Sequence, residues 1–320
     1  MKKIVLLGLL VLGLSTSCER NNVNQENLEI ENTVQKFQGL TFTDWDSFYA
    51  LHTEINQLSS EEEVVDWSLD NNENAFFIKA FTTDDDAELE IADQLTFALM
   101  AIMNVDYKFK VADQTISFVD GVFMANSDLD SELKKIDNLQ ITTIELSSEN
   151  KNATLNSRIN LSNNGHGTAG TTHKDFYRER YLECYTNDYM AGLSSRQMRY
   201  VQQLKATMVG NTAFLWIETK LYWRNSKGKL RYAELEQRNY DYNINGTVSI
   251  KVGPFGSYIT KNIAMGAQDR IKCTRSRWNR KQIASAFPVN NLTPWNINLS
   301  GSIKHQINGD YYSWTAPVNW

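Results

Sequence analysis

Proline and cysteine are scarce in this sequence, which has 4 prolines and 3 cysteines among 320 residues. Glycine is modest at 16 residues, and 42% of the chain is hydrophobic against 22% charged. This composition excludes collagen-like, coiled-coil and wholly disordered proteins. A chain of this size can bury a stable hydrophobic core without disulfides or structural metals. The single long apolar run lies at the extreme N-terminus, so a multi-span membrane protein is excluded as well.

The sequence also lacks the short motifs of common enzyme classes. It has no Gly-x-Ser-x-Gly motif, and its glycine-rich stretch at 163–172 has the spacing of neither a P-loop nor a dinucleotide site. The triplet Asp84-Asp85-Asp86 lacks EF-hand spacing and fits the first turn of a helix instead. These absences favour a non-enzymatic protein without a cofactor, although a serine–histidine–aspartate triad is recognised by geometry and not by composition.

The N-terminus has the pattern of an export signal. Lys2 and Lys3 precede an apolar stretch at 4–14, which is too short to span a bilayer but suits a signal peptide. The small residues Ser-Thr-Ser before Cys18 resemble the lipobox of bacterial lipoproteins, in which the cysteine is lipidated, although Ser15 replaces a more usual aliphatic residue. We expect a signal peptide at 1–18 and a lipid anchor on Cys18. A plain secretory signal is the alternative.

The two remaining cysteines are Cys184 and Cys273. In an oxidising compartment an even pair predicts a disulfide, and closing a loop of this length contributes about 4 kcal/mol by the chain-entropy estimate. Two separate buried thiols remain the alternative, because the sequence does not measure the distance between them.

Charge divides the mature chain into two halves. Residues 19–150 hold 28 acidic and 7 basic side chains, a net charge of −21, whereas residues 151–320 have a net charge of +13. We therefore expect a flexible tether at 19–38, an acidic domain at 39–150 and a basic domain at 151–320. The halves either attract each other across an interface, or the basic half faces a polyanion. Nucleic acid is not expected as a partner of an exported lipoprotein.

Periodicity predicts the elements of both halves. Helices are expected from Thr43, from Ser59 or Ser60, and after Asp86 as far as residue 102, followed by a β-meander with a turn at Asp120-Gly121. The second half alternates with a period of two, which predicts strands at 153–161, 197–209, 212–224, 229–244, 247–252 and a pair within 298–320. The fold class is therefore α+β: a helical unit with a small meander, then an antiparallel β-sandwich-like domain.

Three features together resemble uncharacterised lipoproteins of Bacteroidota. They are the Ser-Thr-Ser-Cys signal, the segment FALMAIMNVDYKFKVADQTISF at 97–118, and a basic β-rich half that contains SGSIKHQINGDYYSW. In that family a helix ending in Asn, here Asn104, precedes a meander with a Gly-Asp turn, which Ala112-Asp113 replaces in this chain. The resemblance covers about half of the chain. It implies placement at the outer membrane, facing the periplasm or the surface, and brings no catalytic residues.

Aromatic and cationic side chains supply the candidate ligand-binding residues. Arg275, Arg277 and Trp278 lie in a basic run, a combination that binds phosphate or stacks on a sugar. Most tryptophans of the basic half are expected in the core, with Trp295 and Trp320 as the exposed exceptions. The resulting expectation is a lipid-anchored envelope protein that binds a glycan or a protein partner.

One loop offers weak metal-binding chemistry. The stretch 163–172 is predicted to be a mobile loop, and His166, His173 and Asp175 in and beside it supply nitrogen and oxygen ligands of the kind zinc prefers. The spacing of the two histidines matches no helical ligand pair. The alternative function, an envelope hydrolase acting on polysaccharide or cell-wall material, would use these three residues.

Overall fold

The computed structural model describes residues 37–58, 60–125, 157–159, 166–178, 196–234, 236–252, 257–271, 276–289, 295–307 and 312–320. The segment Gln38–Trp320 forms one compact unit. This unit is mixed α+β and mostly β, which confirms the predicted class. Cys18, Cys184, Cys273 and Arg275 lie outside the described residues, so the anchor and the disulfide stay predictions.

Five helices precede the large sheets. They are α1 (Trp45–Ile55), α2 (Glu61–Asn71), α3 (Phe76–Thr82), α4 (Asp86–Ala92) and α5 (Phe97–Ile102). The starts follow ordinary capping chemistry, because side-chain oxygens of Asp44, Ser60 and Asp85 accept hydrogen bonds from backbone N–H groups of the first turns. The cap of α1 is Asp44 rather than the predicted Thr43. As predicted, Ser60 begins α2, and Asp84-Asp85-Asp86 lies at the start of a helix, where Asp85 caps α4.

The long helix predicted after Asp86 is wrong. It is interrupted at residues 93–96 and continues as α5. The side chain of Thr96 caps α5 by accepting from the Leu99 N–H at 3.0 Å, and its hydroxyl also bonds to Nε2 of His52 at 2.9 Å. The break frees the carboxylate of Asp93 to face the strands of the second half.

A small sheet packs with the helices. Its strands are β1 (Thr41–Phe42), β2 (Lys108–Val111), β3 (Gln114–Val119) and β4 (Val122–Ala125), in that spatial order. The β3–β4 hairpin turns at Asp120 and Gly121, whose φ angles of 50° and 83° are those of a turn with two left-handed residues. This confirms the predicted meander.

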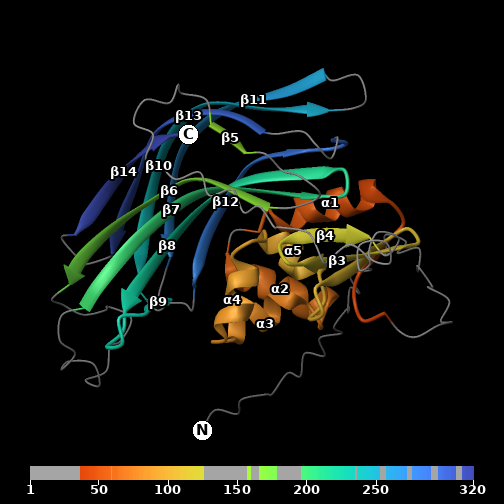
Figure 1. Cartoon of the computed structure of the whole chain (residues 1–320), viewed down its shortest axis with the longest axis horizontal. Coiled ribbons are helices and arrows are strands. Elements are labelled where there is room, and N and C mark those ends of the chain that lie inside the picture. The colour runs from red at the N-terminus through yellow and green to blue at the C-terminus, as the bar shows by residue number, and fades with distance from the viewer. Residues whose placement is uncertain are drawn as a thin grey trace, which may run out of the picture. The chain divides into compact units, whose positions relative to one another are not determined.

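Two larger sheets follow, each with four strands in a row and a fifth beside one of them (Figure 1). The first has the order β12-β8-β7-β6 with β9 on β8, and its strands are β6 (His166–Arg178), β7 (Arg196–Val209), β8 (Thr212–Arg224), β9 (Leu230–Tyr232) and β12 (Trp278–Ala286). The second has the order β11-β10-β13-β14 with β5 on β13, and its strands are β5 (Ser157–Ile159), β10 (Arg238–Val252), β11 (Ser257–Ile271), β13 (Trp295–Ile307) and β14 (Ser313–Asn319).

Three sequence expectations about these strands are wrong. The strand predicted at 229–244 is interrupted after Tyr232, and its two parts, β9 and the start of β10, belong to different sheets. The predicted loop at 163–172 belongs to β6 from His166 onward. Asn245-Gly246, which separates the strands predicted at 229–244 and 247–252 and has the sequence of a turn, is the middle of β10, which runs unbroken between β11 and β13. Gly246 is required there, because a Cβ atom would lie 2.0 Å from the carbonyl oxygen of Asn298 and its φ is +144°.

The first large sheet lies between two cores. Leu215 and Ile217 of β8 point into a core shared with the second large sheet, whereas Phe214 of the same strand joins the core of the helices. Figure 1 shows the helices and the second large sheet on opposite sides of β8. Because both of its faces are covered, β8 is buried along nearly its whole length.

Candidate functional site

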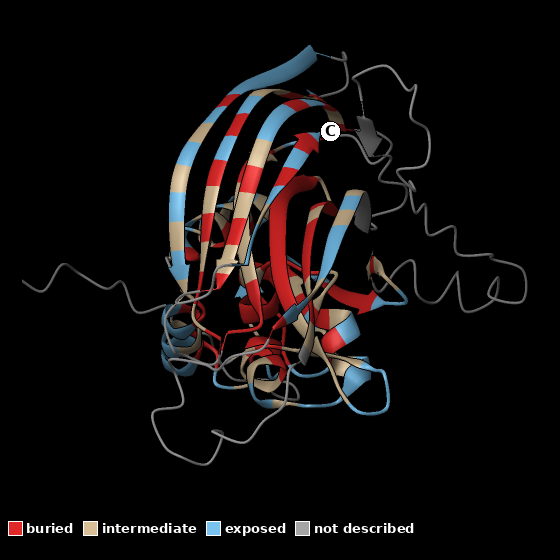
Figure 2. Cartoon of the chain, turned by 90° about the vertical axis from the view of Figure 1, so that its left-hand side faces the viewer, coloured by how far each residue is buried: buried red, intermediate tan, exposed pale blue. Residues whose placement is uncertain are grey.

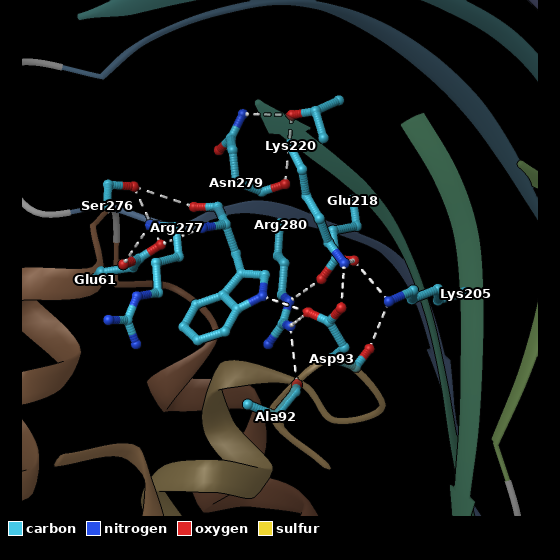
Figure 3. A network of polar contacts seen from close by, with 12 residues as sticks. Glu61, Ala92, Asp93, Lys205, Glu218, Lys220, Ser276, Arg277, Asn279 and Arg280 are labelled. Carbon is cyan, nitrogen blue, oxygen red and sulfur yellow. Dashed lines mark hydrogen bonds and ion pairs between the residues drawn. The ribbon is translucent and has the colours of Figure 1, made fainter. Parts of the chain in front are cut away.

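A network of charged side chains lies where the first large sheet meets the helices (Figure 3). Its centre is Glu218 on β8, whose side chain is 0% exposed. Lys205 and Lys220 approach its Oε1 atom at 2.6 and 2.8 Å, and Nε of Arg280 donates to its Oε2 atom at 2.5 Å. These residues come from three neighbouring strands, β7, β8 and β12, which places them side by side on one sheet face.

Asp93 connects this cluster to the helices. It lies in the turn between α4 and α5 and accepts hydrogen bonds from Nζ of Lys220 at 2.7 Å, from the Tyr232 hydroxyl at 2.8 Å and from Nε1 of Trp278 at 2.5 Å. Its side chain is 27% exposed, so the network reaches solvent at this point. The guanidinium of Arg280 also donates to the Ala92 carbonyl and thereby satisfies the end of α4.

Burial and charge act in opposite directions on these groups. Burial would raise the pKa of Glu218, but Lys205 and Lys220 lower it well below its ordinary value. Asp93 likewise has a lowered pKa, because the same two lysines outweigh the effect of its burial. Burial lowers the pKa of Lys205 to about 8, despite the attraction of Glu218. Three cations thus share two carboxylates, and Lys205 is the group closest to losing its charge at neutral pH.

A second buried carboxylate lies at the start of α2. Glu61 accepts hydrogen bonds from the backbone N–H of Trp278 at 2.9 Å and from the hydroxyl of Ser276 at 3.1 Å. Burial raises its pKa to about 7, although these hydrogen bonds and the charge of Arg238 act in the opposite direction. Its neighbour Arg277 donates to Glu234 and to the Ala80 carbonyl, both at 2.7 Å.

These contacts show where the charge asymmetry of the sequence is used. Among the described residues, acidic groups of the helical segment meet cations of the basic half in five pairs: Asp93 with Lys220 and Arg280, Asp86 with Lys229 and Arg231, and Asp84 with Arg277. The exposed pairs of Asp86 contribute little to stability. For the buried Lys220, removing a carboxylate partner is costly, although a buried pair gains little over an apolar replacement. The ion pairs and hydrogen bonds of the network therefore fix the position of the helices on the first large sheet.

The predicted ligand-binding tryptophans lie in the interior. Trp278 is 1% exposed and Trp295 is 2% exposed, and Trp320 is 3% exposed. The expected exposure of Trp295 and Trp320 is therefore wrong. Both rings fill the core between the two large sheets, whereas the Trp278 ring packs in the core of the helices. Arg277 is buried as well, and no face of these residues is open to a sugar in solution.

The predicted metal ligands are spread along β6. His166 pairs with Thr207 and His173 pairs with Val201, so seven strand positions separate them. A register irregularity lies between them, and their partners on β7 are six positions apart, which at about 3.3 Å per residue is roughly 20 Å, too far for one ion. Asp175 is engaged by Arg199 through two hydrogen bonds of 2.6 and 2.8 Å. The residues that the structure describes contain no group of three metal-ligating side chains.

The central residues of the network were missed by the sequence reasoning. Glu218 and Lys220 alternate in phase with Phe214 and Trp216 in one run of β8. The sequence contained one indication of the network: charged residues at strand positions whose alternation with apolar residues predicts burial. Asp93 had a weaker signal, because it lies inside an apolar helical stripe.

A second surface stands out on the far side of the second large sheet. Alternate residues of β10 and β13 face the core, so the residues between them face outward, as the alternating colours of Figure 2 show. We call the outward set the amide face: Asn239, Asp241, Asn243, Asn245, Thr247 and Ser249 on β10, with Asn296, Asn298, Ser300, Ser302, Lys304 and Gln306 on β13.

The amide face is polar but nearly neutral. Within this set, the two charged residues Asp241 and Lys304 are direct cross-strand partners and compensate each other. Two exposed cations, Lys251 of β10 and Arg270 of β11, lie on the same side of the sheet at the two ends of the set. Asn243, Asn245 and Asn298 are exposed. Within the described part of the chain, their side-chain amides are not hydrogen-bonded to other protein groups, which leaves donors and acceptors free for a ligand.

Comparisons with known proteins do not assign this chain to a family. No protein-family model matches it. No curated protein is similar to it. Among the helices that the structure describes, none combines the length and the apolar character needed to cross a membrane.

Proposed function

We propose that this protein is a lipid-anchored module of the bacterial cell envelope that binds a neutral glycan through the amide face. The observation that carries the proposal is the row of outward asparagine, serine and threonine side chains on β10 and β13. Each amide offers both donors and an acceptor, and a hydroxyl-rich ligand requires both. The core shared by the two large sheets supports a β-sandwich as the scaffold of this face.

Charge favours a neutral ligand over a polyanion. Four of the cations that contact the helical segment, Lys205, Lys220, Arg277 and Arg280, are buried against carboxylates and are not presented to solvent. Two others, Lys229 and Arg231, are partly exposed but are paired with Asp86. The amide face contributes one cation and one carboxylate. An acidic polymer would gain little in the middle of this face, because the two exposed cations on the same side, Lys251 and Arg270, lie only at its ends.

The anchor is the second part of the proposal, and it rests on the sequence. Cys18 follows an eleven-residue apolar stretch and three small residues. An acyl chain contributes about 0.8 kcal/mol for each CH₂ group it buries, so a multiply acylated cysteine would hold the protein on the outer membrane. Replacing Cys18 with Ala is expected to release the protein from isolated membranes. Retention of the variant on the membranes would contradict the anchor.

Glycan binding is tested by titration calorimetry and thermal unfolding of the purified full-length chain with neutral and acidic oligosaccharides. A ligand at 100 times its dissociation constant stabilises by about 2.7 kcal/mol, which gives a clear thermal shift. The double variant Asn243→Ala, Asn298→Ala is expected to weaken binding of a neutral glycan at least tenfold. Gln57→Ala, an exposed amide on the helical side, is the matched control and should bind normally.

Two outcomes would contradict the proposed ligand. One is binding of acidic glycans alone, because the amide face has no excess positive charge. The other is neutral-glycan binding that the amide-face variant and the Gln57 variant retain equally, because the ligand would then lie elsewhere.

A further inference from the structure

The outer strands of the two large sheets differ in how they are protected from pairing with another chain. An exposed strand edge is a template for a further strand, and proteins block such edges with prolines, bulges or short strands. β14 has seven residues and contains Pro317. β12 has a register irregularity between Gln282 and Ala284, and β6 has one between Ala169 and Thr172.

β11 has none of these protections. It is fifteen residues long, contains no proline, and pairs with β10 in continuous register from Ser257 to Ile271. Among the described residues, no strand pairs with its outer edge. Tyr258 and Ile259 at its start are 61% and 46% exposed, which is unusual for such large side chains. Figure 1 shows β11 at the margin of its sheet.

We propose that β11 pairs with β11 of a second copy of this chain, antiparallel and centred on Met265. In this register residues whose numbers sum to 530 lie opposite each other. Lys261 of each copy then faces Asp269 of the other, and Ile259 faces Ile271. The outward set also matches, because Asn262 faces Gln268. Opposite charges, apolar residues and amides are each placed against their own complement.

The complementarity selects this register over its neighbours. A side chain must remain on its own face of the sheet, so the alternatives are shifts that move the centre by one residue. Centring on Ala264 would place Asp269 opposite Ile259, and centring on Gly266 would place it opposite Ile263. Both leave a carboxylate against an apolar side chain and separate it from Lys261. Within its own copy, Asp269 is already bonded by Lys281 at 2.7 Å and by Asn279 at 3.0 Å, so Lys261 of the second copy is a further partner of a carboxylate that is held in place.

The symmetry of the pairing is closed. Antiparallel pairing of two identical strands has a twofold axis, so each copy uses the same surface and neither β11 edge is left to add a third copy. The second large sheet would become continuous across both copies. Two amide faces would then lie on one side of that sheet, which doubles the surface available to an extended ligand.

The pairing is tested with the purified full-length chain in detergent. Sedimentation velocity should show a dimer that dissociates on dilution. Met265→Cys should form a disulfide-linked dimer on mild oxidation, because Cα atoms paired on the axis lie about 4.5–5.5 Å apart, within disulfide range. The unsubstituted chain controls for the native cysteines. Ala267→Cys should not cross-link to itself, since its partner in this register is Ile263.

A charge reversal tests the interface without altering the core. Lys261→Glu places two carboxylates opposite each other and should raise the dimer dissociation constant about tenfold, whereas Lys251→Glu on β10, an equal charge change away from the edge, should leave it unchanged. A chain that stays monomeric at every concentration would overturn the pairing. Stronger cross-linking at Ala267 than at Met265, or equal effects of the two lysine variants, would overturn it as well. None of these measurements involves a glycan.

Discussion

Nζ of Lys220 donates a hydrogen bond to the carboxylate of Asp93 at 2.7 Å, although 127 residues separate the two in the chain. Asp93 belongs to the acidic half of the sequence and Lys220 to the basic half. Their contact joins the turn between α4 and α5 to the middle of the first large sheet. Through Glu218, the same lysine is connected to two further buried cations.

Removing the central carboxylate should cost far more than removing one cation. Glu218→Gln keeps the side-chain shape but leaves Lys205, Lys220 and Arg280 with Asp93 as their one remaining carboxylate in the cluster. We expect a loss of about 3–5 kcal/mol in the free energy of unfolding, as for other uncompensated buried charges. Lys205→Met removes the excess cation and should cost clearly less. Urea denaturation at pH 7 measures both. Equal losses would contradict the account.

Glu61 should make the protein less stable as the pH rises. Its folded-state pKa of about 7 lies above the ordinary value of 4.5, so the folded chain holds a proton that the unfolded chain has lost between these two values. Its contribution is complete below pH 4.5 and decreases by about 3 kcal/mol up to pH 7. Relative to wild type, Glu61→Gln should therefore gain stability by that amount over the same window. A pH-independent difference between the two proteins would refute the shift.

The two buried histidines His52 and His305 should make the protein less stable as the pH falls, which is the opposite pH dependence to that of Glu61. Burial lowers the pKa of both His52 and His305 to about 3, against an ordinary 6.5, so each is neutral in the folded chain where the unfolded chain is protonated. Their contribution is complete above pH 6.5 and decreases by about 1.4 kcal/mol per pH unit for each histidine as the pH falls. His305→Gln still can donate a hydrogen bond to Gln202. In this variant, the free energy of unfolding should fall less steeply on acidification, by about 1.4 kcal/mol per pH unit. The double variant with His52→Gln should reduce the slope by twice that amount.

Gly246 and Gly266 form a matched pair for testing the close approach of β10 and β13. Alanine at 246 would bring Cβ to 2.0 Å from the Asn298 oxygen at a φ of +144°, whereas nothing lies within 4 Å of a Cβ at 266. We expect Gly246→Ala to lower the free energy of unfolding by roughly 3 kcal/mol or more and Gly266→Ala to change it by less than about 1 kcal/mol. Thermal unfolding compares them directly. Similar melting temperatures would show that the strands can separate locally.

Local patterns were sufficient to predict much of the secondary structure. The period of two predicted β8 to the residue and β7 to within one residue, and Asp120-Gly121 predicted the hairpin of the small sheet. These elements follow from short-range rules of alternation and turn chemistry. The prediction failed at Gly246, because Asn-Gly is a turn signal in isolation and only the approach of β13 makes glycine necessary inside a strand.

The site depends on contacts that no local pattern contains. Glu218, Lys205 and Arg280 come from three strands, and their convergence requires the register of the whole sheet. Asp93 was missed because one continuous helix was predicted there, although Thr96 is a capping residue that begins a new helix three residues later. Trp295 was expected to be exposed because its neighbours are turn formers, whereas it opens β13 and fills the core.

The helical core includes Phe214 and Trp278, two side chains that the ribosome adds long after the last helix residue. Residues 38–125 therefore emerge during synthesis with one apolar side uncovered, and their packing cannot be completed until β8 and β12 have been made. Segments in this condition are prone to association. The same segment has a large excess of acidic side chains, and like charge of this size opposes association of such nascent chains until the basic strands are made.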